Sequence, residues 1–425
     1  MKKVSLMRSP IQLAFGMLCA LAGAVPVHAA DNFDALLAQA LQTHPAVEGR
    51  RASLEAAKAD KEGADWQLYP TPSLEATARD AGGSSNIFAL EQPLWNAGRI
   101  SAGIRAAGFR EVAAEAAVVE AKLTTGLRVI AAYTDVLRLT QRLNYARTAV
   151  DEHNKLVDLI GRRVAQEVSP QVDRDFAQSR MAQATTDLSL SAQGLQVAQV
   201  QLSQLVGRPV GAIEDVRLEG KLVPATLDEA VNRAVDNSPA LARLEQTALA
   251  AGEDVTVRRA AIFPQLSVRV ESQTGSLPSV LPDNRILLVL RAQPGAGLSA
   301  GSAIAAAQRR VDEARLAKEE ATRNVREQVQ TAFTEWRAAQ VRLGSTRDSA
   351  TMAQSVFDSY TRQYVTGRKT WIDVLNAVRE ISQSQFILAD AEALAKASAL
   401  RLWLLTGEGP MRDAAASSKT ADARK

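Results

Sequence analysis

The side chains that most often perform catalysis or bind metals are scarce in this sequence. Besides His28 near the N-terminus, the histidines are His44 and His153, which we place in two different helices. Neither has a cysteine or a second histidine at a metal-binding spacing. The signature motifs of serine hydrolases, zinc proteases and phosphate-binding loops are absent from the sequence. We therefore interpret both histidines as packing or surface residues, and we predict no enzyme activity, no cofactor and no metal site.

One glycine-rich segment is similar to a dinucleotide-binding turn. Gly295, Gly297 and Gly301 follow an apolar strand and open a predicted helix. Their spacing is G-x-G-x-x-x-G instead of G-x-G-x-x-G, and no series of parallel strands and helices surrounds them. We interpret this segment as a flexible passage from a strand to a helix.

The first thirty residues have the pattern of a secretory signal peptide. A basic start with Lys2 and Lys3 precedes an apolar run that ends at about Val27, and small residues allow cleavage after Ala29 or Ala30. An uncleaved membrane anchor is the alternative, but the apolar run is short for a membrane span. The pattern favours export of the chain out of the cytoplasm.

Cleavage would leave a chain without cysteine and without net charge. Cys19 is the single cysteine, so the mature protein has no disulfide and no thiolate metal site. Three of the 50 basic residues also leave with the signal, and the remaining 47 face 47 acids. These charges are interspersed, so no basic stripe for nucleic acid is predicted. The aromatic content of 4% favours helices packed side by side over a thick globular core.

The chain contains an internal duplication. Residues 34–76 align without gaps on residues 228–270, prolines included, and from residue 131 the offset becomes 200, which places Asp173 on Asp373. Chance similarity among alanine-rich helices is the alternative, and the shared prolines and turns argue against it. The predicted segments are a signal peptide (1–30), a first repeat (31–207), a linker (208–227), a second repeat (228–409) and a disordered tail (410–425).

Each repeat predicts a first helix, two short strands, one very long helix and a returning helix. The long helices span roughly Ala97–Val164 and Gly301–Val365, contain no proline, and at about 1.5 Å per residue are on the order of 100 Å long. Turns near residues 167–170 and 366–370 reverse the chain. The first and returning helices together match the long helix in length, so we expect them to stack end to end along it. Apolar residues at alternating steps of three and four indicate a coiled-coil-like seam.

The predicted strands, near residues 73–79, 86–93, 265–273 and 285–293, alternate in polarity. One apolar face, one charged face and about nine residues per strand are typical of an outer membrane barrel with a wet lumen, and a small soluble sheet is the alternative. About eight strands are needed to close a barrel, so four membrane strands must pair with other chains. A trimer would supply twelve. The predicted membrane-strand residues are Leu74, Phe88, Leu90, Leu266, Val268 and Leu288.

The mature chain resembles the TolC family of outer membrane factors from about Asp31 to Gly409. The tandem repeat, a Tyr-Pro or Phe-Pro pair before a strand, and two motifs carry this resemblance. Residues 92–99, QPLWNAGR, are similar to the family's Q-P-L-F-x-G-G-R, and residues 364–376, YVTGRKTWIDVLN, are similar to its hairpin-tip motif. The resemblance implies a mainly α fold with a small β part. Three chains would form a periplasmic α-helical barrel and a twelve-stranded outer membrane β-barrel, four strands from each chain.

By the same resemblance, the protein is a passive outer membrane channel that extends into the periplasm. It would dock on a periplasmic adaptor protein and an inner-membrane transporter. Residues 293–298 and 367–377 look most like the branch that exports adhesins by type I secretion, which uses an ABC transporter. A multidrug or small-molecule efflux pump is the first alternative, and a periplasmic coiled-coil scaffold without a pore is the second. Such a conduit has no dedicated substrate pocket, so the sequence does not indicate the cargo.

The resemblance also implies a gate at the hairpin tips. Asp373 matches a family aspartate at the periplasmic constriction, Lys369 matches a basic residue that bridges it, and Asn376 replaces a second aspartate, which weakens the ring. Helix capping by the aspartates is the alternative. The predicted gate residues are Asp173, Asp373, Lys369, Tyr364 and Asn376. Because the long helices reverse only at the two turns, we expect the adaptor to dock there, on Gln166, Glu167, Gly367, Arg368 and Thr370.

Overall fold

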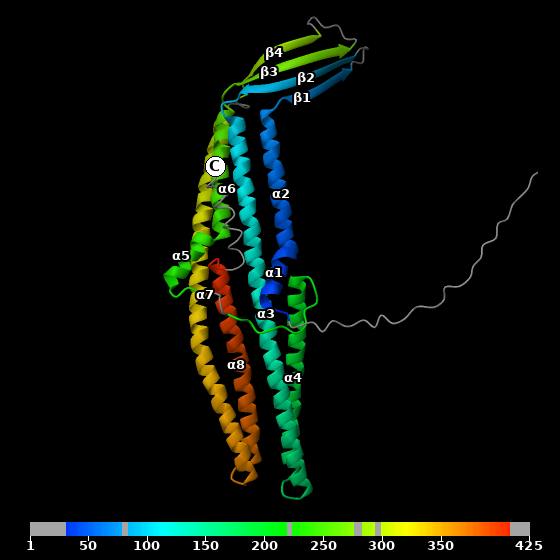
Figure 1. The fold of residues 1–425 in the computed structure, drawn as a ribbon, viewed down its shortest axis with the longest axis vertical. Coiled ribbons are helices and arrows are strands. Elements are labelled where there is room, and N and C mark those ends of the chain that lie inside the picture. Colours follow the sequence, from blue (N-terminus) through cyan, green and yellow to red (C-terminus); the bar gives the residue numbers. More distant parts are fainter. Residues whose placement is uncertain (1–30, 79–83, 219–222, 276–282, 294–298, 409–425) are drawn as a thin grey trace, which may run out of the picture.

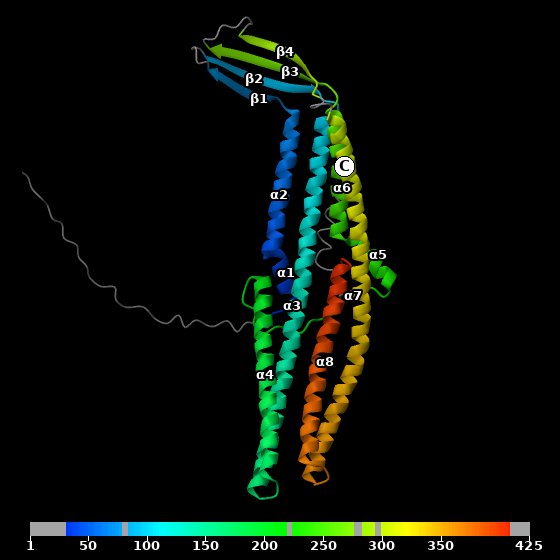
Figure 2. The same cartoon turned by 180° about the vertical axis from the view of Figure 1, so that it is seen from behind.

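The computed structural model describes residues 31–78, 84–218, 223–275, 283–293 and 299–408 (Figure 1). They form an elongated molecule with a sheet at one end and long helices along the rest of its length (Figures 1 and 2). The prediction of a mainly α fold with a small β part is confirmed. The predicted signal peptide, the predicted tail and most of the glycine-rich segment lie outside the described residues.

Helices make up most of the described chain. They are α1 (Phe33–Thr43), α2 (Pro45–Asp65), α3 (Arg99–Ala165), α4 (Gln171–Val206), α5 (Leu227–Asn237), α6 (Pro239–Ala260), α7 (Ala300–Val365) and α8 (Trp371–Leu405), with a short 3-10 turn at Trp66–Leu68. Pro45 and Pro239 occupy the first turns of α2 and α6, where the missing N–H has no helical partner to lose. No helix in the described ranges is long and apolar enough to cross a membrane.

The helices form two columns beside the long helices. Both α2 and α4 contact α3 and follow one another along it, and α6 and α8 do the same along α7 (Figures 1 and 2). The predicted end-to-end stacking is therefore confirmed. Helix α3 also contacts α6 and α8, so it joins the two repeats. With 67 residues, α3 is about 100 Å long, and its apolar seam is covered by these neighbours.

The sheet combines strands of both repeats. Its order is β1 (Thr71–Ala78), β2 (Ser84–Trp95), β3 (Gln265–Gly275) and β4 (Asn284–Arg291), all antiparallel. The central pairing of β2 with β3 joins the repeats, with Leu90 opposite Val270. The register shifts between Pro93 and Trp95, where proline cannot donate to the ladder. Strands β1 and β4 are the two edges.

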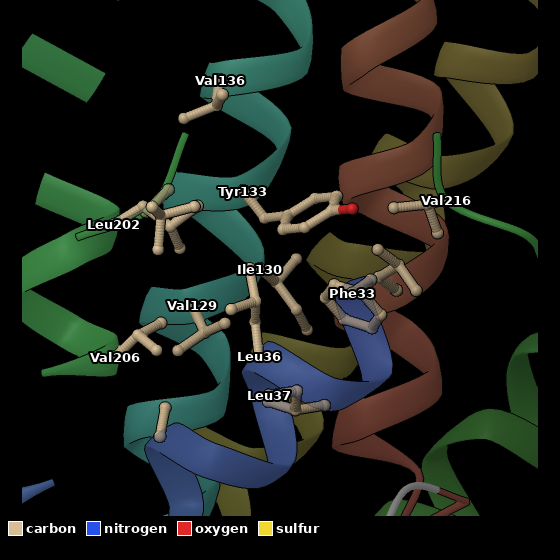
Figure 3. Packing of buried hydrophobic residues seen from close by; sticks show 14 of the residues in the cluster. Phe33, Leu36, Leu37, Val129, Ile130, Tyr133, Val136, Leu202, Val206 and Val216 are labelled. Atoms are coloured by element: carbon tan, nitrogen blue, oxygen red, sulfur yellow. The ribbon is translucent and has the colours of Figure 1, made fainter. Parts of the chain in front are cut away.

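A belt, made of α1, residues 208–218 and α5, lies at mid-length of the bundle (Figure 1). Inside it, Tyr133 at the middle of α3 is fully buried and meets the ring of Phe33 edge-on, with centroids 5.2 Å apart (Figure 3). The Tyr133 hydroxyl donates to the carbonyls of Asp31 (3.2 Å) and Glu214 (2.6 Å). Burial, with the nearby Glu214 carboxylate, raises the pKa of Tyr133 above its usual range, so this hydroxyl remains a donor.

Two features of this region differ from the sequence analysis. Helices α1 and α5, each of 11 residues, were not predicted. His44 was placed inside a helix, and this is wrong, because it lies between α1 and α2. Its Nδ1 accepts the Ala46 N–H at 3.1 Å and so caps α2, since Pro45 cannot continue the preceding helix.

Candidate functional site

One face of the sheet is apolar and open to solvent. Leu74 lies opposite Phe88, Leu90 opposite Val270, Val268 opposite Leu288 and Leu266 opposite Leu290, so the six predicted membrane-strand residues share this face. Leu74 is 73% exposed and Leu288 is 69% exposed. Soluble monomers rarely expose an apolar surface that continues across four strands. This face is therefore suited to an apolar environment.

The opposite face carries charges that neutralise one another. Glu91 on β2 accepts a hydrogen bond from the Ser267 hydroxyl (2.6 Å) and pairs with Arg269 on β3. Glu271 on β3, whose side chain is buried, pairs with Arg285 on β4 at 2.6 Å. This ionic network spans three strands. The sheet can thus meet hydrocarbon on one face and water on the other.

Both helical hairpins turn at the end of the molecule opposite the sheet (Figure 1). There they pack against each other, with the Phe176 ring of α4 edge-on to the Trp371 ring of α8 at 5.7 Å between centroids. We call the buried residues of this region the tip cluster; they are Leu156, Ile160, Ala177, Tyr364, Val374, Leu375 and Val378. The two tips therefore form one packed unit.

The first tip, between α3 and α4, has a non-glycine residue in a left-handed conformation. Glu167 has φ 58°, which lets the Val168 N–H reach the Arg163 carbonyl at 2.9 Å. Pro170 precedes α4, and its carbonyl accepts the Asp173 N–H. In the described residues, the Asp173 side chain forms no hydrogen bond or ion pair. The predicted docking residues at this tip, Gln166 and Glu167, are exposed.

The second tip, between α7 and α8, is held by a glycine and a capping box. Gly367 has φ 73°, and Thr370 caps α8. The Thr370 N–H and hydroxyl donate to Asp373 Oδ2 at 3.0 and 2.9 Å, and the Asp373 N–H reaches the Thr370 hydroxyl at 3.3 Å. These two bonds from Thr370, with the charge of Lys369, lower the pKa of Asp373. Asp373 therefore caps its helix, and its role in a gate stays a prediction. Gly367, Arg368 and Thr370 are exposed.

The other predicted gate residues lie close to this tip. Lys369 Nζ sits 4.2 Å from the centre of the Tyr360 ring and forms no ion pair with any described residue. Tyr364 is buried, the guanidinium of Arg163 is 5.7 Å from the centre of its ring, and its hydroxyl has no hydrogen-bond partner in the described part of the chain. Asn376 is exposed on α8. The expected bridge from Lys369 is thus absent within the described single chain.

The named docking residues did not include four apolar side chains that are exposed at the tips. Val168 (59% exposed) and Val172 (72%) belong to the first tip, and Val365 (78%) and Ile372 (46%) belong to the second. Exposed apolar groups beside polar ones are typical of surfaces that bind another protein. Their signal in the sequence was the presence of apolar residues within otherwise polar turns.

Comparison with known proteins identifies this architecture. A family model described as outer membrane efflux protein matches residues 36–208 and 230–408, one match for each repeat. The chain is 22% identical over 283 residues to the outer membrane efflux protein BepC of Brucella suis biovar 1 (strain 1330), covering 62% of this chain and 59% of BepC. It is 28% identical over 162 residues to the pyoverdine export outer membrane protein OpmQ of Pseudomonas aeruginosa, covering 38% of this chain and 34% of OpmQ. It thus spans less than two thirds of either relative.

The fold is shared with solved structures. The outer membrane protein VceC of Vibrio cholerae superimposes with a TM-score of 0.76 at 19% identity, over 88% of this chain and 96% of VceC. The resemblance to the TolC family is confirmed by this fold and by the family model. Proteins of this family are passive conduits and not enzymes. The chain belongs to the outer membrane efflux protein family, and it is located in the outer membrane and extends into the periplasm.

Proposed function

We propose that this protein is the outer membrane channel of a tripartite export system and works as a homotrimer. The observation that carries the proposal is the two-faced sheet at one end of about 100 Å of helix. Among the described residues, strands β1 and β4 each have one partner strand, and neighbouring chains would pair with their other edges. Twelve strands would then close, with the apolar face toward lipid and the ionic network toward the lumen.

Membrane insertion and conductance test the channel. Leu288→Glu places a charge on the apolar face, so we expect the protein to be lost from the outer membrane fraction. The matched control is Leu287→Glu, which lies on the opposite face beside Arg269 and should still insert and conduct in a planar bilayer. A wild-type protein that stays in the soluble periplasmic fraction and shows no conductance would instead be a scaffold without a pore.

The tips are the proposed docking surface for a periplasmic adaptor. Gln166, Glu167, Gly367, Arg368 and Thr370 are exposed there, next to the four exposed apolar residues. Cysteines introduced at Gln166 or Arg368 should crosslink to the adaptor in cells, and Cys19 is the only native cysteine to consider. A cysteine at Arg217 in the belt is the control. Crosslinking at Arg217 without crosslinking at the tips would place docking elsewhere.

The same tips are the proposed gate. In a trimer Asp173 and Asp373 would supply six carboxylates around the opening, which attract cations and repel one another. The charge and geometry of this carboxylate ring would also depend on three residues near the second tip, Lys369, Tyr364 and Asn376. The double variant Asp173→Asn and Asp373→Asn should conduct more and select less for cations. If well-folded trimers of this variant conduct as the wild type does, the two aspartates have no gating role.

For the cargo, we propose a large protein such as an adhesin, exported by type I secretion through an inner-membrane ABC transporter. The similarity of residues 367–377 to that branch supports this proposal. Small-molecule efflux is the second candidate, because the two relatives are named for efflux and pyoverdine export. Deletion of the gene should remove a large surface protein without changing dye accumulation. Increased dye accumulation with an unchanged surface would support efflux instead.

A further inference from the structure

A pocket of about 470 Å³ lies between α3, α4 and α8, in the half of the molecule that ends at the tips. Three small residues on the facing helices, Ala146, Ala149 and Ala184, leave this space open where larger side chains would fill the seam. The volume falls within the range of small-molecule sites. Because all three walls come from one chain, the pocket exists without any partner.

The pocket has an excess of positive charge. Each helix contributes one arginine to its lining: Arg142 from α3, Arg180 from α4 and Arg379 from α8. Arg142 pairs with Asp390 at 3.5 Å, whereas Arg180 and Arg379 form no ion pair with any described residue. The carboxylate on the lining is Asp187, which accepts a hydrogen bond from Gln183 at 3.4 Å. The Arg180 guanidinium lies 5.0 Å from the centre of the Phe176 ring, a contact that supplies no counter-ion, so two guanidinium groups can still pair with an anion.

A buried histidine also lines the pocket. His153 is 6% exposed, and its Nδ1 has no hydrogen-bond partner among the described residues. Burial, followed by the charge of Arg180, lowers its pKa, so the ring has no charge of its own to oppose that arginine. By contrast, Nδ1 of His44 is used in a helix cap. Buried polar atoms normally have a partner, and Nδ1 is enclosed by protein without one in the described part of the chain, so the ring contributes a neutral wall to the pocket.

We propose that this pocket binds a small oxyanion, a phosphate or a carboxylate group of a small molecule, between Arg180 and Arg379 and against His153. The planar guanidinium fork matches both kinds of oxyanion, and two arginines from different helices can hold one group between them. A bound anion would contact α4 of the first repeat and α8 of the second. It would therefore hold the two hairpins together, which goes beyond the conduit function proposed above.

Isothermal titration of the purified full-length protein in detergent, in a chloride buffer, tests this inference. The probes are inorganic phosphate and citrate, which separate phosphate from carboxylate recognition. We expect saturable binding of at least one of them. Arg180→Gln and Arg379→Gln should each weaken that binding at least fivefold, and the double variant should abolish it. Arg309→Gln on α7, whose side chain is 86% exposed, is the control and should bind as the wild type does.

Three outcomes would overturn the proposal. The first is the absence of saturable binding of both probes to the wild type, and the second is equal affinity in the wild type and the double variant. The third is binding of a tetraglutamate peptide without binding of either probe, which would assign the pocket to a protein partner. The single variants are titrated separately so that a folded protein remains available if the double variant is unstable. None of these measurements depends on channel activity.

Discussion

The two hairpin tips follow the same backbone path but are stabilised in different ways. Glu167 and Gly367 are equivalent residues, 200 positions apart, and both are left-handed. Thr370 and Asp373 form a capping box at the second tip, whereas Pro170 occupies the position of Thr370 at the first. The second tip therefore has the residues that its turn requires, and the first does not.

This difference shows how a duplicated turn can keep its shape after it loses its local stabilisation. A left-handed non-glycine residue costs roughly 1–2 kcal/mol, and an N-cap contributes about 1 kcal/mol. The first tip has neither a glycine at its left-handed position nor a side chain that caps α4. Its shape therefore depends on packing against the second tip through Phe176 and Trp371. We infer that the second tip supports the first.

The largest effect is expected from the tip cluster that joins the tips. Leu375 is 3% exposed, so Leu375→Ala should cost about 2–5 kcal/mol of local opening free energy. Hydrogen exchange of peptides from both tips should increase, because the first tip depends on the second. Ile372→Ala, at a residue that is 46% exposed, is the matched control and should change exchange little. Faster exchange at the second tip alone would show that the tips are independent.

Exchanging the left-handed residues should give effects of opposite sign. A Cβ at Gly367 would meet nothing within 4 Å, so Gly367→Ala changes only the backbone preference and should destabilise that turn by about 1 kcal/mol. Glu167→Gly should stabilise the first turn by a similar amount. Hydrogen exchange of residues 163–169 and 363–369 measures both. Destabilisation by Glu167→Gly would mean that its side chain makes a contribution larger than the strain.

Removing the capping threonine from the second tip, or adding one to the first, should change local stability by no more than the exchange of the left-handed residues does. Thr370→Ala should lower protection of the first turn of α8 by about 1 kcal/mol. Pro170→Thr would place a threonine three residues before Asp173 and should raise protection of α4 by at most that amount. The two variants should therefore bring the tips closer in local stability. An unchanged α8 in Thr370→Ala would show that packing already determines its start.

The smallest effect is expected from lowering the pH, which protonates the Asp373 carboxylate and weakens the cap of α8. The pKa of Asp373 is lowered in the folded protein, so the stability that its carboxylate adds is fully present above the unfolded aspartate pKa of about 3.9. It is lost as the pH falls through the lower folded value. The difference in α8 exchange between the wild type and Thr370→Ala should thus be constant from neutral pH to about pH 4. Below it, the difference should shrink to the part that the Thr370 hydroxyl contributes by accepting the Asp373 N–H. A difference of the same size at pH 2 as at neutral pH would contradict this assignment.

The sequence predicted the long elements well and the short ones poorly. Proline at residues 45 and 239 and the coiled-coil seams located the starts and ends of the principal helices within two residues. Helix α1 was missed because its 11 residues carry too little periodicity alone. Its apolar side chains, such as Phe33 and Leu36, acquire a partner only when the chain folds against α3.

The candidate site was predictable to the extent that its structure is local. The positions of both turns, and the capping alternative for Asp373, followed from residue types within a few positions. The stacking of Lys369 on Tyr360 and the burial of Tyr364 depend on packing within and between hairpins, which a sequence pattern does not contain. The proposed gate would need neighbouring chains, so a single chain contains only its proposed components.

The belt holds α3 at its middle, at Tyr133, so a tilt of this helix would pivot about that point. The columns beside α3 consist of separate helices that meet at this height. Tyr133 of the continuous helix donates to the Glu214 carbonyl in the belt, and the Arg208–Asp31 pair joins the belt to the segment before α1. About 50 Å of helix extends from this point to the tips, half of its length of about 100 Å. A tilt of about 5° at the belt would displace the tips by about 4 Å over this arm. A change of tilt at the belt would therefore displace the hairpin tips, which lie about 50 Å away along the helix.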